Sequence, residues 1–235
     1  MALPFFYSEN ISASQKSHAF DEDTSKHIVQ VLRMQNGEQL QLTDGKGNLF
    51  TTEITNNNKK SCKVEILTTD HRPQTDRKVS IAISIVKNTS RFEWFLEKAT
   101  EIGVNEIVPL ICTRTEKQHF RYDRMKTIVV SAMLQSQQVW LPLLHEPIKF
   151  SQFIEQPGEH QKLIAHCLDD EKQQLSHLQI SKSSNLQIAI GPEGDFTNEE
   201  IQLAMSNNFI PVSLGHTRLR TETAGIVAAT LLTQL

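Results

Sequence analysis

The chain has few cysteines, and they are spread along its length. Cys62, Cys112 and Cys167 are far apart and form no CxxC pair. Their spacing argues against a disulfide framework and against a cysteine metal cluster. The nine histidines are also scattered, without the spacing of metal ligands. We therefore expect no bound metal and a reducing, cytoplasmic setting.

Long apolar runs are missing as well. No stretch approaches the length of about 20 apolar residues that a membrane-spanning helix needs. The first ten residues, MALPFFYSEN, have neither the basic start nor the apolar core of a signal peptide. The sequence therefore predicts no association with a membrane.

The chain also lacks an excess of positive charge. It carries 24 lysines and arginines against 27 aspartates and glutamates, a net charge of −3. Proteins that coat nucleic acid without sequence preference are usually basic overall, so this balance argues against that class. Any binding of RNA must depend on local basic patches.

The common phosphate-binding loops are absent too. The sequence contains neither the GxxxxGKS/T pattern of nucleotide triphosphatases nor the GxGxxG pattern of dinucleotide-binding folds. The acidic residue that binds the ribose in dinucleotide-binding enzymes is also missing. A nicotinamide-dependent enzyme is therefore the weakest interpretation.

Two other glycine-bearing loops each follow a predicted strand. IAIGPEGDFTNEE (188–200) has the pattern of a buried strand, a tight turn and a helix with a Thr197–Glu200 capping box. SLGHTRLRTETAG (213–225) continues a strand at 209–214 and leads to a helix from Glu222. In open α/β sheets, ligands bind in the crevice beyond the carboxyl ends of the strands. The strand KLIAHC (162–167) is expected to end at the same crevice.

The ligand expected at these loops is one that main-chain groups can hold. Glycine lets a ligand approach the backbone and permits unusual backbone angles. An adenosine or a methionine tail would suit such N–H and C=O contacts. A plain turn at GPEG and a solvated helix entry at TRLRTE remain the alternative, because motif matches carry false positives.

The first 70 residues are rich in predicted β-structure. EQLQLTDGKGNLFTTEIT alternates in polarity around 44–47, which is a strong hairpin signal. Several short strands separated by turns predict a small barrel. The polar segment 71–78 contains a proline and is expected to link two domains.

From residue 79 onwards, strands and helices alternate. Strands are predicted at 79–86 and 106–111, and between them a helix that opens with a Ser90–Glu93 capping box and ends at Gly103. Further helices are expected at 122–139 and 150–155. Such βαβ units imply a mainly parallel sheet. We therefore predict an α/β protein with a β-rich domain at 1–72 and a second domain at 73–235.

One stretch of the second domain suits RNA. CTRTEKQHFRYDR (112–124) interleaves Arg114, Arg121 and Arg124 with aromatic residues. Phosphates attract cations and unpaired bases stack on rings, so this pattern favours RNA binding. An ordinary solvated loop and helix start is the alternative.

Several motifs, in the right order, match one known family. They are HIVQVLRMQNGEQLQLTDGKG, FLEKATEIGVNEIVPL, IGPEG and LGHTRLRTETA. With them, the chain resembles the bacterial 16S ribosomal RNA uridine-N3 methyltransferases (RsmE type) of the SPOUT class over nearly its whole length. The resemblance implies a PUA-like RNA-binding barrel at 1–72 and a SPOUT α/β trefoil knot with a mainly parallel sheet at 73–235. It also implies S-adenosyl-L-methionine as methyl donor, the small ribosomal subunit as partner and a homodimer through the C-terminal domain.

The resemblance implies a cofactor cradle, and the chemistry of uracil methylation and the basic pattern suggest roles for further residues. The cofactor cradle would comprise Ala165, His166, Ile190, Gly191, Glu193, Gly194, Leu214, Gly215, Leu219, Arg220, Thr223 and Ala224. Arg220 is the candidate that stabilises negative charge on the uracil, and Glu222 either orients the arginine, accepts the N3 proton, or only favours the helix N-terminus. The candidate RNA-binding residues are Arg33, Lys87, Arg91, Arg114, Arg121, Arg124 and Arg218.

Two departures from the family pattern involve three positions. Asp195 stands where a second glycine usually follows GPEG, and Thr217 and Arg218 stand where the family has an arginine followed by an aliphatic residue. Two alternative functions stay open. One is a SPOUT methyltransferase acting on another RNA, either on the ribose 2′-oxygen or on a base of transfer RNA. The other is a non-catalytic RNA-binding factor of ribosome assembly.

Overall fold

The computed structural model describes residues 3–158, 160–168, 172–178 and 185–234, which form two compact units. The first unit consists of the chain up to Gln74 together with Met133–Leu141, and the second of Thr75–Ala132 and the chain from Pro142. The chain therefore crosses between the units after Gln74, Ala132 and Leu141. None of the helices in the described ranges is long and apolar enough to cross a membrane.

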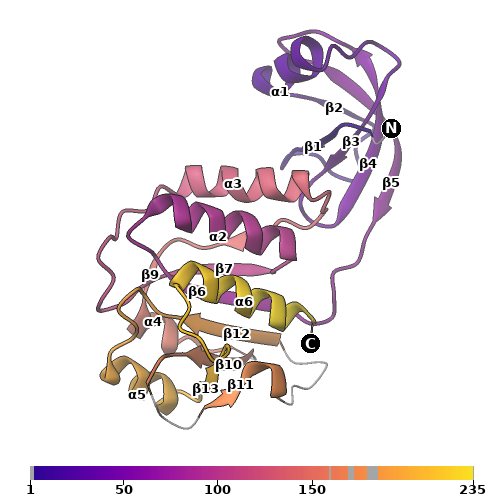
Figure 1. Cartoon of the computed structure of the whole chain (residues 1–235). Coiled ribbons are helices and arrows are strands. Elements are labelled where there is room, and N and C mark those ends of the chain that lie inside the picture. The colour runs from indigo at the N-terminus through magenta and orange to yellow at the C-terminus, as the bar shows by residue number, and fades with distance from the viewer. Residues whose placement is uncertain (1–2, 159, 169–171, 179–184, 235) are drawn as a thin grey trace. The chain divides into compact units, whose positions relative to one another are not determined.

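Five strands of the described chain form the sheet of the N-terminal unit, in the order β1-β3-β4-β5-β2. β1 pairs with β3 in parallel, and the other neighbours are antiparallel. Leu40, Leu42 and Phe50 alternate inwards from β3 and β4 and are fully buried in its core. The elements are β1 (Phe5–Tyr7), β2 (Ser17–Ala19), α1 (Glu22–Lys26), the π-helix η1 (His27–Val31), β3 (Gln39–Thr43), β4 (Asn48–Asn56) and β5 (Lys63–His71) (Figure 1).

The predicted β3–β4 hairpin is confirmed, and its turn has a clear local cause. The Asp44 carboxylate accepts hydrogen bonds from the Lys46 N–H at 2.8 Å and from Asn48 Nδ2 at 2.6 Å. Gly45 and Gly47 have φ angles of 72° and 93°, which residues with side chains rarely adopt. The turn is therefore specified by residues within the hairpin itself.

Residues 133–141 complete the N-terminal unit from a distant part of the sequence. The Gly47 N–H donates to the Val139 carbonyl at 2.9 Å, and Trp140 Nε1 donates to the Arg72 carbonyl at 2.9 Å. The Trp140 ring fills the space beside Gly47, where a Cβ would lie 2.4 Å from it. Any larger residue at Gly47 would therefore displace the indole.

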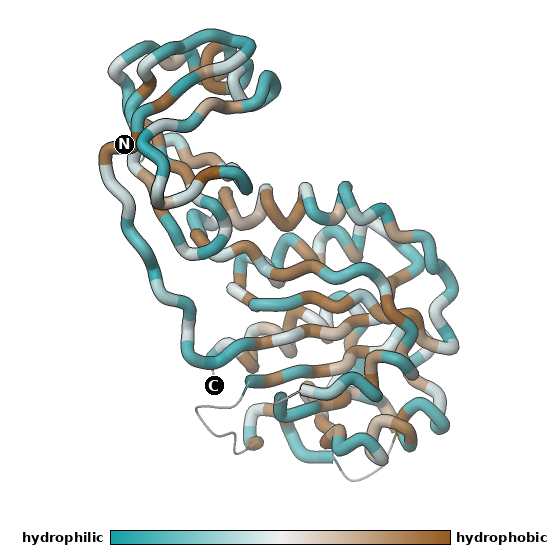
Figure 2. Tube along the Cα trace, turned by 180° about the vertical axis from the view of Figure 1, so that it is seen from behind, coloured by the Kyte–Doolittle hydropathy of each residue, from teal (hydrophilic) through white to brown (hydrophobic). Residues whose placement is uncertain are grey.

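Eight strands within the described ranges form the sheet of the C-terminal unit, and their pairings are parallel. The order is β11-β13-β10-β12-β6-β7-β8, with β9 also paired to β7. Figure 2 shows hydrophobic residues concentrated along these strands, as expected for a parallel sheet that is covered on both faces. The strands are β6 (Val79–Ser84), β7 (Glu106–Ile111), β8 (Leu143–Leu144), β9 (Ile148–Lys149), β10 (His160–Ala165), β11 (Gln173–Gln174), β12 (Asn185–Ile190) and β13 (Ile210–Ser213).

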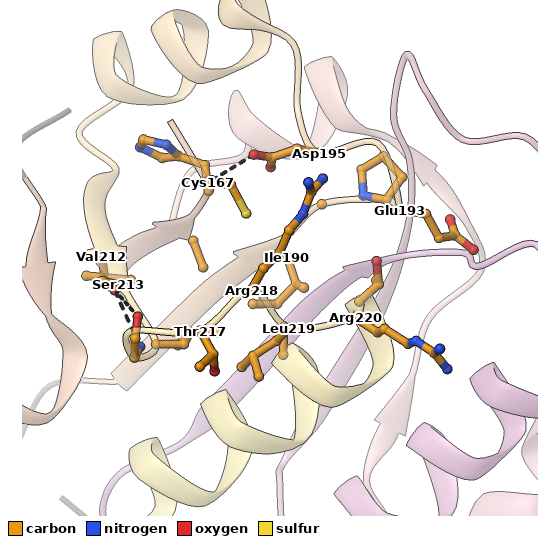
Figure 3. Close-up of a pocket in the computed structure, with 18 of the residues that line it drawn as sticks. Cys167, Ile190, Glu193, Asp195, Val212, Ser213, Thr217, Arg218, Leu219 and Arg220 are labelled. Carbon is orange, nitrogen blue, oxygen red and sulfur yellow. Dashed lines mark hydrogen bonds between the residues drawn. The ribbon is translucent and has the colours of Figure 1, made fainter. Parts of the chain in front are cut away.

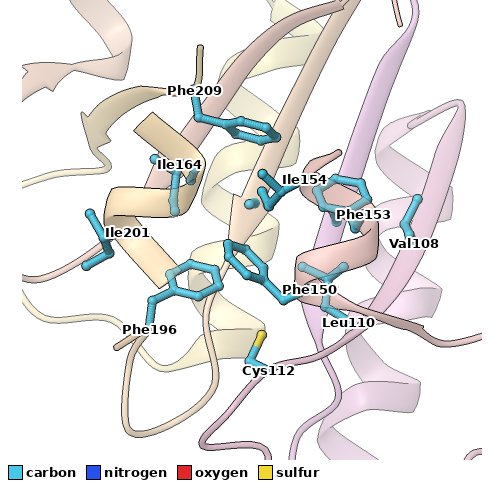
Figure 4. Close-up of a cluster of buried hydrophobic side chains, with 13 residues drawn as sticks. Val108, Leu110, Cys112, Phe150, Phe153, Ile154, Ile164, Phe196, Ile201 and Phe209 are labelled. Carbon is cyan, nitrogen blue, oxygen red and sulfur yellow. The ribbon is translucent and has the colours of Figure 1, made fainter. Parts of the chain in front are cut away.

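Helices cover both faces of this sheet. α2 and α6 pack against each other on one face, where α6 also packs against β6, and α4 and α5 lie on the other face (Figure 1). Under α4 and α5, a cluster of aromatic rings that includes Phe150, Phe153 and Phe209 packs on Ala82 and Ile164 of the strands (Figure 4). The helices are α2 (Thr89–Ile102), α3 (Tyr122–Gln135), α4 (Phe150–Ile154), the 3₁₀ turn η2 (Leu175–His177), α5 (Asn198–Ser206) and α6 (Thr221–Gln234).

α6 lies on a different part of the sheet from the strand that precedes it. α6 follows β13 in sequence, yet it packs against β12 and β6, on the other side of β10 in the sheet order. The connection from β13 to α6 therefore passes β10 in the sheet. A Cβ at Gly225 would lie 2.6 Å from the Phe95 ring and 2.7 Å from Ile83, so glycine allows the close approach of α6. The predicted α/β fold class with a mainly parallel sheet is confirmed, and the β-rich N-terminal unit forms a smaller five-stranded sheet within the described residues.

Some predicted boundaries need correction. The Ser90–Glu93 capping box is wrong: Asn88 caps α2 by accepting from the Ser90 N–H at 3.0 Å, and Glu93 pairs with Arg124 instead. The helix expected to run to residue 139 ends at Gln135, because the chain then turns toward the β3–β4 hairpin. The remaining predicted strands and helices are found within a few residues of their expected ends.

Local signals were reliable where both partners are close in sequence. The Thr197–Glu200 capping box is confirmed, with both reciprocal hydrogen bonds present. Gly103 ends α2 in the left-handed conformation, with a φ of 95°. These short-range contacts set the ends of two helices that flank the strand ends.

Candidate functional site

A pocket of about 790 Å³ lies at the carboxyl ends of β10, β12 and β13 (Figure 3). Because the three strands are parallel neighbours, the loops that follow them meet at this edge of the sheet. The wall is formed by Arg91, Ala165, His166, Cys167, Lys172, Ile190, Gly191, Pro192, Glu193, Asp195, Val212, Ser213, Leu214, Gly215, His216, Thr217, Arg218, Leu219, Arg220, Thr221 and Ala224.

The structure brings most of the expected cofactor residues together in this pocket. Gly194 and Thr223 are the two that lie outside its wall. The carbonyl of Gly194 instead accepts a hydrogen bond from Arg114, and Thr223 lies within α6. The residues that do line the pocket are Ala165, His166, Ile190, Gly191, Glu193, Leu214, Gly215, Leu219, Arg220 and Ala224.

The loop after β12 is a tight turn fixed at several points. The Asp195 N–H donates to the Pro192 carbonyl at 2.9 Å and closes the turn. A Cβ at Gly191 would lie 3.1 Å from Phe196, so the turn packs closely on itself. The Glu193 carboxylate accepts from the Lys87 N–H at 2.8 Å, which attaches the turn to the loop between β6 and α2. The pocket wall is therefore rigidly supported on this side.

Arg114 holds the same turn from the loop after β7. Its Nη1 donates to the Gly194 carbonyl at 2.6 Å and to the Phe196 carbonyl at 3.3 Å. Next to it, the Thr113 N–H donates to the Glu200 carboxylate at 2.8 Å. A residue that the sequence pattern proposed for RNA thus has its guanidinium bound to the pocket loop.

The loop after β13 carries the two arginines of the pocket that come from the LGHTRLRTETA motif. Ser213 Oγ donates to the Gly215 carbonyl at 2.9 Å, and Gly215 has a φ of 148°. Beyond it, the Arg218 side chain extends toward Asp195, whereas Arg220 extends away from it (Figure 3). The Ala224 N–H donates to the Arg220 carbonyl at 2.7 Å, which begins α6.

The two candidate catalytic residues are placed differently. Arg220 lines the pocket, but Glu222 does not. Glu222 is buried at the start of α6, with its Oε1 3.6 Å from Nε of Arg91. Arg91 itself lines the pocket from α2. The arginine that Glu222 contacts is therefore Arg91, not its sequence neighbour Arg220.

The expected RNA-binding residues fall into three groups. Arg91 and Arg218 line the pocket. Lys87 and Arg124, like Arg114, are engaged by other groups: Lys87 pairs with Glu116 at 2.6 Å, and Arg124 with Glu93 at 2.5 Å. The hydrogen bond from Arg124 lowers the pKa of Glu93, and the bond to Glu116 raises the pKa of Lys87. The third group consists of Arg121, which precedes α3, and Arg33 of the N-terminal unit, and both are exposed.

Sequence reasoning missed several pocket residues. Lys172 reaches back to donate to the carbonyls of His166 and Leu168 and closes the loop after β10. Burial raises the pKa of the Cys167 thiol, and Asp195 raises it further, while Arg218 and Lys172 oppose this shift. Cys167 could have been identified as a pocket residue because it follows the end of a predicted strand, but no local sequence pattern identifies Lys172. The others missed are Pro192, Asp195, Val212, Ser213, His216, Thr217 and Thr221.

In the described part of the chain, no group of three or more His, Cys, Asp or Glu side chains is arranged to hold a metal ion. The pocket instead combines main-chain edges, apolar side chains such as Ile190 and Leu219, and both signs of charge. This composition suits an organic ligand with polar ends.

Comparison with known families agrees with both units. The family model described as an RNA methyltransferase domain matches residues 73–233, and the one described as an RNA methyltransferase PUA domain matches residues 20–67. A "Ribosomal RNA small subunit methyltransferase E" of Synechocystis sp. is 31% identical over 86% of this chain and 68% of its own length.

Solved structures are similar over almost the whole chain. A probable rRNA-methyltransferase from Porphyromonas gingivalis has a TM-score of 0.90 and 36% identity, covering 99% of this chain and 98% of its own. A ribosomal RNA small subunit methyltransferase E from Neisseria gonorrhoeae, bound to S-adenosyl methionine, has a TM-score of 0.88 and 29% identity, covering 99% and 97%.

Proposed function

Because the chain belongs to the RNA methyltransferase family of ribosomal RNA small subunit methyltransferase E, we propose that it methylates N3 of a uridine in 16S rRNA with S-adenosylmethionine as donor. The observation that carries the proposal is the pocket where the loops after β10, β12 and β13 meet. Those loops contain the IGPEG and LGHTRLRTETA motifs.

The residues of the pocket fit this cofactor. Its volume of about 790 Å³ is in the range of small-molecule sites. Ala165, Ile190 and Leu219 supply apolar surface for an adenine ring, and the main chain of the two motif loops supplies polar edges. Arg218 and Lys172 provide positive charge for a carboxylate. When bound, the cofactor supplies an electrophilic methyl group on a sulfonium.

The chain must supply what the uracil needs for attack. N3 is a weak acid, so its proton passes to solvent water or hydroxide, and negative charge develops on N3, O2 and O4. An arginine aimed at those oxygens stabilises this charge without any reorganisation during the reaction. Arg220 is the residue for this task, because it lines the pocket and is exposed to an incoming base.

Glu222 has a supporting task. Its carboxylate is buried against Arg91 at the start of α6 and does not line the pocket, so it orients the Arg91 side chain rather than receiving the N3 proton. A second positive group is thereby held at the pocket wall. N3 lies on the Watson–Crick edge, so the target uridine must be unpaired or flipped out to reach these arginines.

Binding of the small ribosomal subunit needs contacts outside the pocket. Arg121 and Arg33 are exposed cations suited to phosphates, one in each unit. The protein works as a homodimer through its C-terminal unit, and the exposed Trp94 on α2 is a candidate contact. Small-subunit assembly takes place in the cytoplasm of bacteria, where this activity belongs.

The test is product analysis. The protein is incubated with S-adenosylmethionine labelled in its methyl group and with small ribosomal subunits that lack the modification, and the RNA is digested to nucleosides. Label in 3-methyluridine is the expected result. Label in a 2′-O-methylated nucleoside, or transfer only to tRNA, would favour another substrate, and no heat on calorimetric titration with the cofactor would favour a binding protein.

A further inference from the structure

One side chain connects two of the three pocket loops. Asp195, after β12, accepts a hydrogen bond through Oδ2 from the Cys167 N–H at 2.7 Å (Figure 3). Its other oxygen, Oδ1, accepts from the Phe196 N–H at 2.8 Å. Both Asp195 and Cys167 line the pocket. We refer to this pair of bonds as the Asp195 bridge.

The bridge continues the connection between β10 and β12 past the end of the sheet. The strands pair in register up to Ala165 and Ile190. Beyond those residues both loops contribute residues to the pocket wall, and the Asp195 bridge joins them. Hydrogen bonds to an ionised carboxylate are shorter and stronger than those between neutral groups. The bridge is therefore able to fix the separation of the two walls.

The backbone conformation of Asp195 would suit glycine better, which indicates that the carboxylate has a role of its own. Its φ is 64°, in the left-handed region where glycine is the unstrained choice. Glycine would satisfy the turn but would leave the Cys167 N–H without this acceptor. Arg218 extends toward Asp195 from the third loop (Figure 3), so the carboxylate is flanked by positive charge. A residue that is less suited to the backbone thus contributes a contact that glycine does not offer.

We propose that Asp195 is a positioning residue that holds the loop after β10 against the loop after β12 and so preorganises the cofactor pocket. This inference rests on the proposed function, because it assumes that the pocket binds S-adenosylmethionine. A preorganised site loses less conformational freedom on binding. Loss of the bridge should therefore weaken cofactor binding and raise its KM, while kcat at saturation changes little.

Asp195→Gly is the sharpest variant, because glycine fits the backbone and removes only the carboxylate. Asn208→Gly is the matched control: Asn208 has a φ of 65°, follows α5 and does not line the pocket. It introduces the same glycine flexibility without loss of the bridge. Asp195→Asn keeps one acceptor oxygen and therefore one of the two bonds.

Two readouts are needed: hydrogen exchange of the Cys167 amide in the free protein, and the Kd for S-adenosylmethionine by calorimetry. In Asp195→Gly, we expect the exchange rate of the Cys167 amide and the Kd each to rise at least about tenfold, because the charge-assisted hydrogen bond between the two loops is lost. Asp195→Asn should be intermediate, and Asn208→Gly should match the wild type in both.

Three results would overturn the inference. They are unchanged Cys167 exchange in Asp195→Gly, an unchanged Kd in that variant, and an equal loss in Asn208→Gly. Failure of the proposed function is seen separately, because the wild-type protein would then bind no cofactor. The exchange readout needs no cofactor and would still test whether the bridge joins the two loops.

Discussion

Nε of Arg91 on α2 lies 3.6 Å from the carboxylate of Glu222 at the start of α6. The glutamate side chain is only 8% exposed, whereas the arginine is 43% exposed and reaches the pocket. A buried carboxylate is costly unless it is paired, so Glu222 needs Arg91. In return, the arginine is fixed at the pocket wall.

This relationship predicts that Arg91 and Glu222 act as one unit. Arg91→Ala and Glu222→Gln should each lower kcat/KM, and the double variant should be no worse than the more damaged single one. A double-mutant cycle should give a coupling of about 1 kcal/mol, as for residues in direct contact. Additive losses would contradict the pairing. An activity loss in Glu222→Gln that is recovered at high pH would instead indicate that Glu222 accepts the N3 proton.

Arg220→Ala tests the stabilisation of charge on the uracil. We expect kcat to fall about 100-fold, the usual effect of removing one donor to a developing anion. The Kd for S-adenosylmethionine, measured by calorimetry, should stay within about threefold of the wild type because the proposed cofactor contacts are made by other groups of the pocket. Arg218→Ala is the matched control in the same loop and should keep most of kcat. Near-normal methyl transfer by Arg220→Ala would remove that residue from the mechanism.

Arg114 and Arg121 belong to the same basic segment, but their substitution should affect different ligands. Arg114→Ala should weaken S-adenosylmethionine binding by about tenfold, because it removes the hydrogen bonds to the turn at Gly194 and Phe196. Arg121→Ala should leave cofactor binding unchanged and weaken binding to the ribosomal subunit. A lost phosphate contact should also lower the slope of log K against log salt by about 1. The same phenotype in both variants would show that the two arginines share a role.

The amino ends of the strands carry a pH-dependent contact. The hydrogen bond from His145 lowers the pKa of Glu106, and Ser80 and His160 add to this effect against the opposing effect of burial. A lowered carboxyl pKa means that the contribution to stability is present above the ordinary glutamate pKa and is lost as pH falls through the folded-state pKa.

Glu106→Gln should therefore lower the free energy of unfolding by about 1 kcal/mol at about pH 6, and the difference should shrink toward about pH 3. Urea denaturation of both proteins across this range measures it. Glu97→Gln is a suitable control, because Glu97 lies on the surface of α2 beside Lys98. If the difference in free energy of unfolding between wild type and Glu106→Gln stays constant with pH, the hydrogen bond to His145 does not depend on the charge of the carboxylate.

Much of the fold followed from short-range patterns in the sequence. The apolar runs of β6 and β12, the glycine that ends α2 and the Thr197–Glu200 capping box depend on residues close to one another in the chain. The same logic failed at Ser90, because Asn88, two residues earlier, offers a better acceptor to the helix start. Sequence spacing alone does not show which of two neighbouring candidate residues caps a helix.

The contacts that organise the pocket were hidden because their partners are far apart in sequence. Arg114 binds a carbonyl 80 residues away, and Asp195 binds an amide 28 residues away. Trp140 reaches the hairpin of the N-terminal unit from beyond α3. The motifs located the loops after β12 and β13, but only the three-dimensional arrangement shows which charged residues support those loops.

We propose that S-adenosylmethionine occupies the pocket at the ends of β10, β12 and β13, and the reactivity of Cys167 offers a direct measurement of this binding. Cys167 is exposed in the pocket wall, whereas Cys62 and Cys112 are buried, and burial raises the pKa of the Cys112 thiol to about 12. Alkylation of the folded protein by iodoacetamide at mildly alkaline pH should therefore modify Cys167 alone, which peptide mass spectrometry can verify.

Saturating S-adenosylmethionine should slow this alkylation at least about tenfold, with a midpoint equal to the calorimetric Kd. Adenosine triphosphate, which shares the nucleoside but lacks the methionine tail, should protect poorly at the same concentration. Calorimetric binding of S-adenosylmethionine with an unchanged rate of Cys167 alkylation would place the cofactor elsewhere and contradict the account.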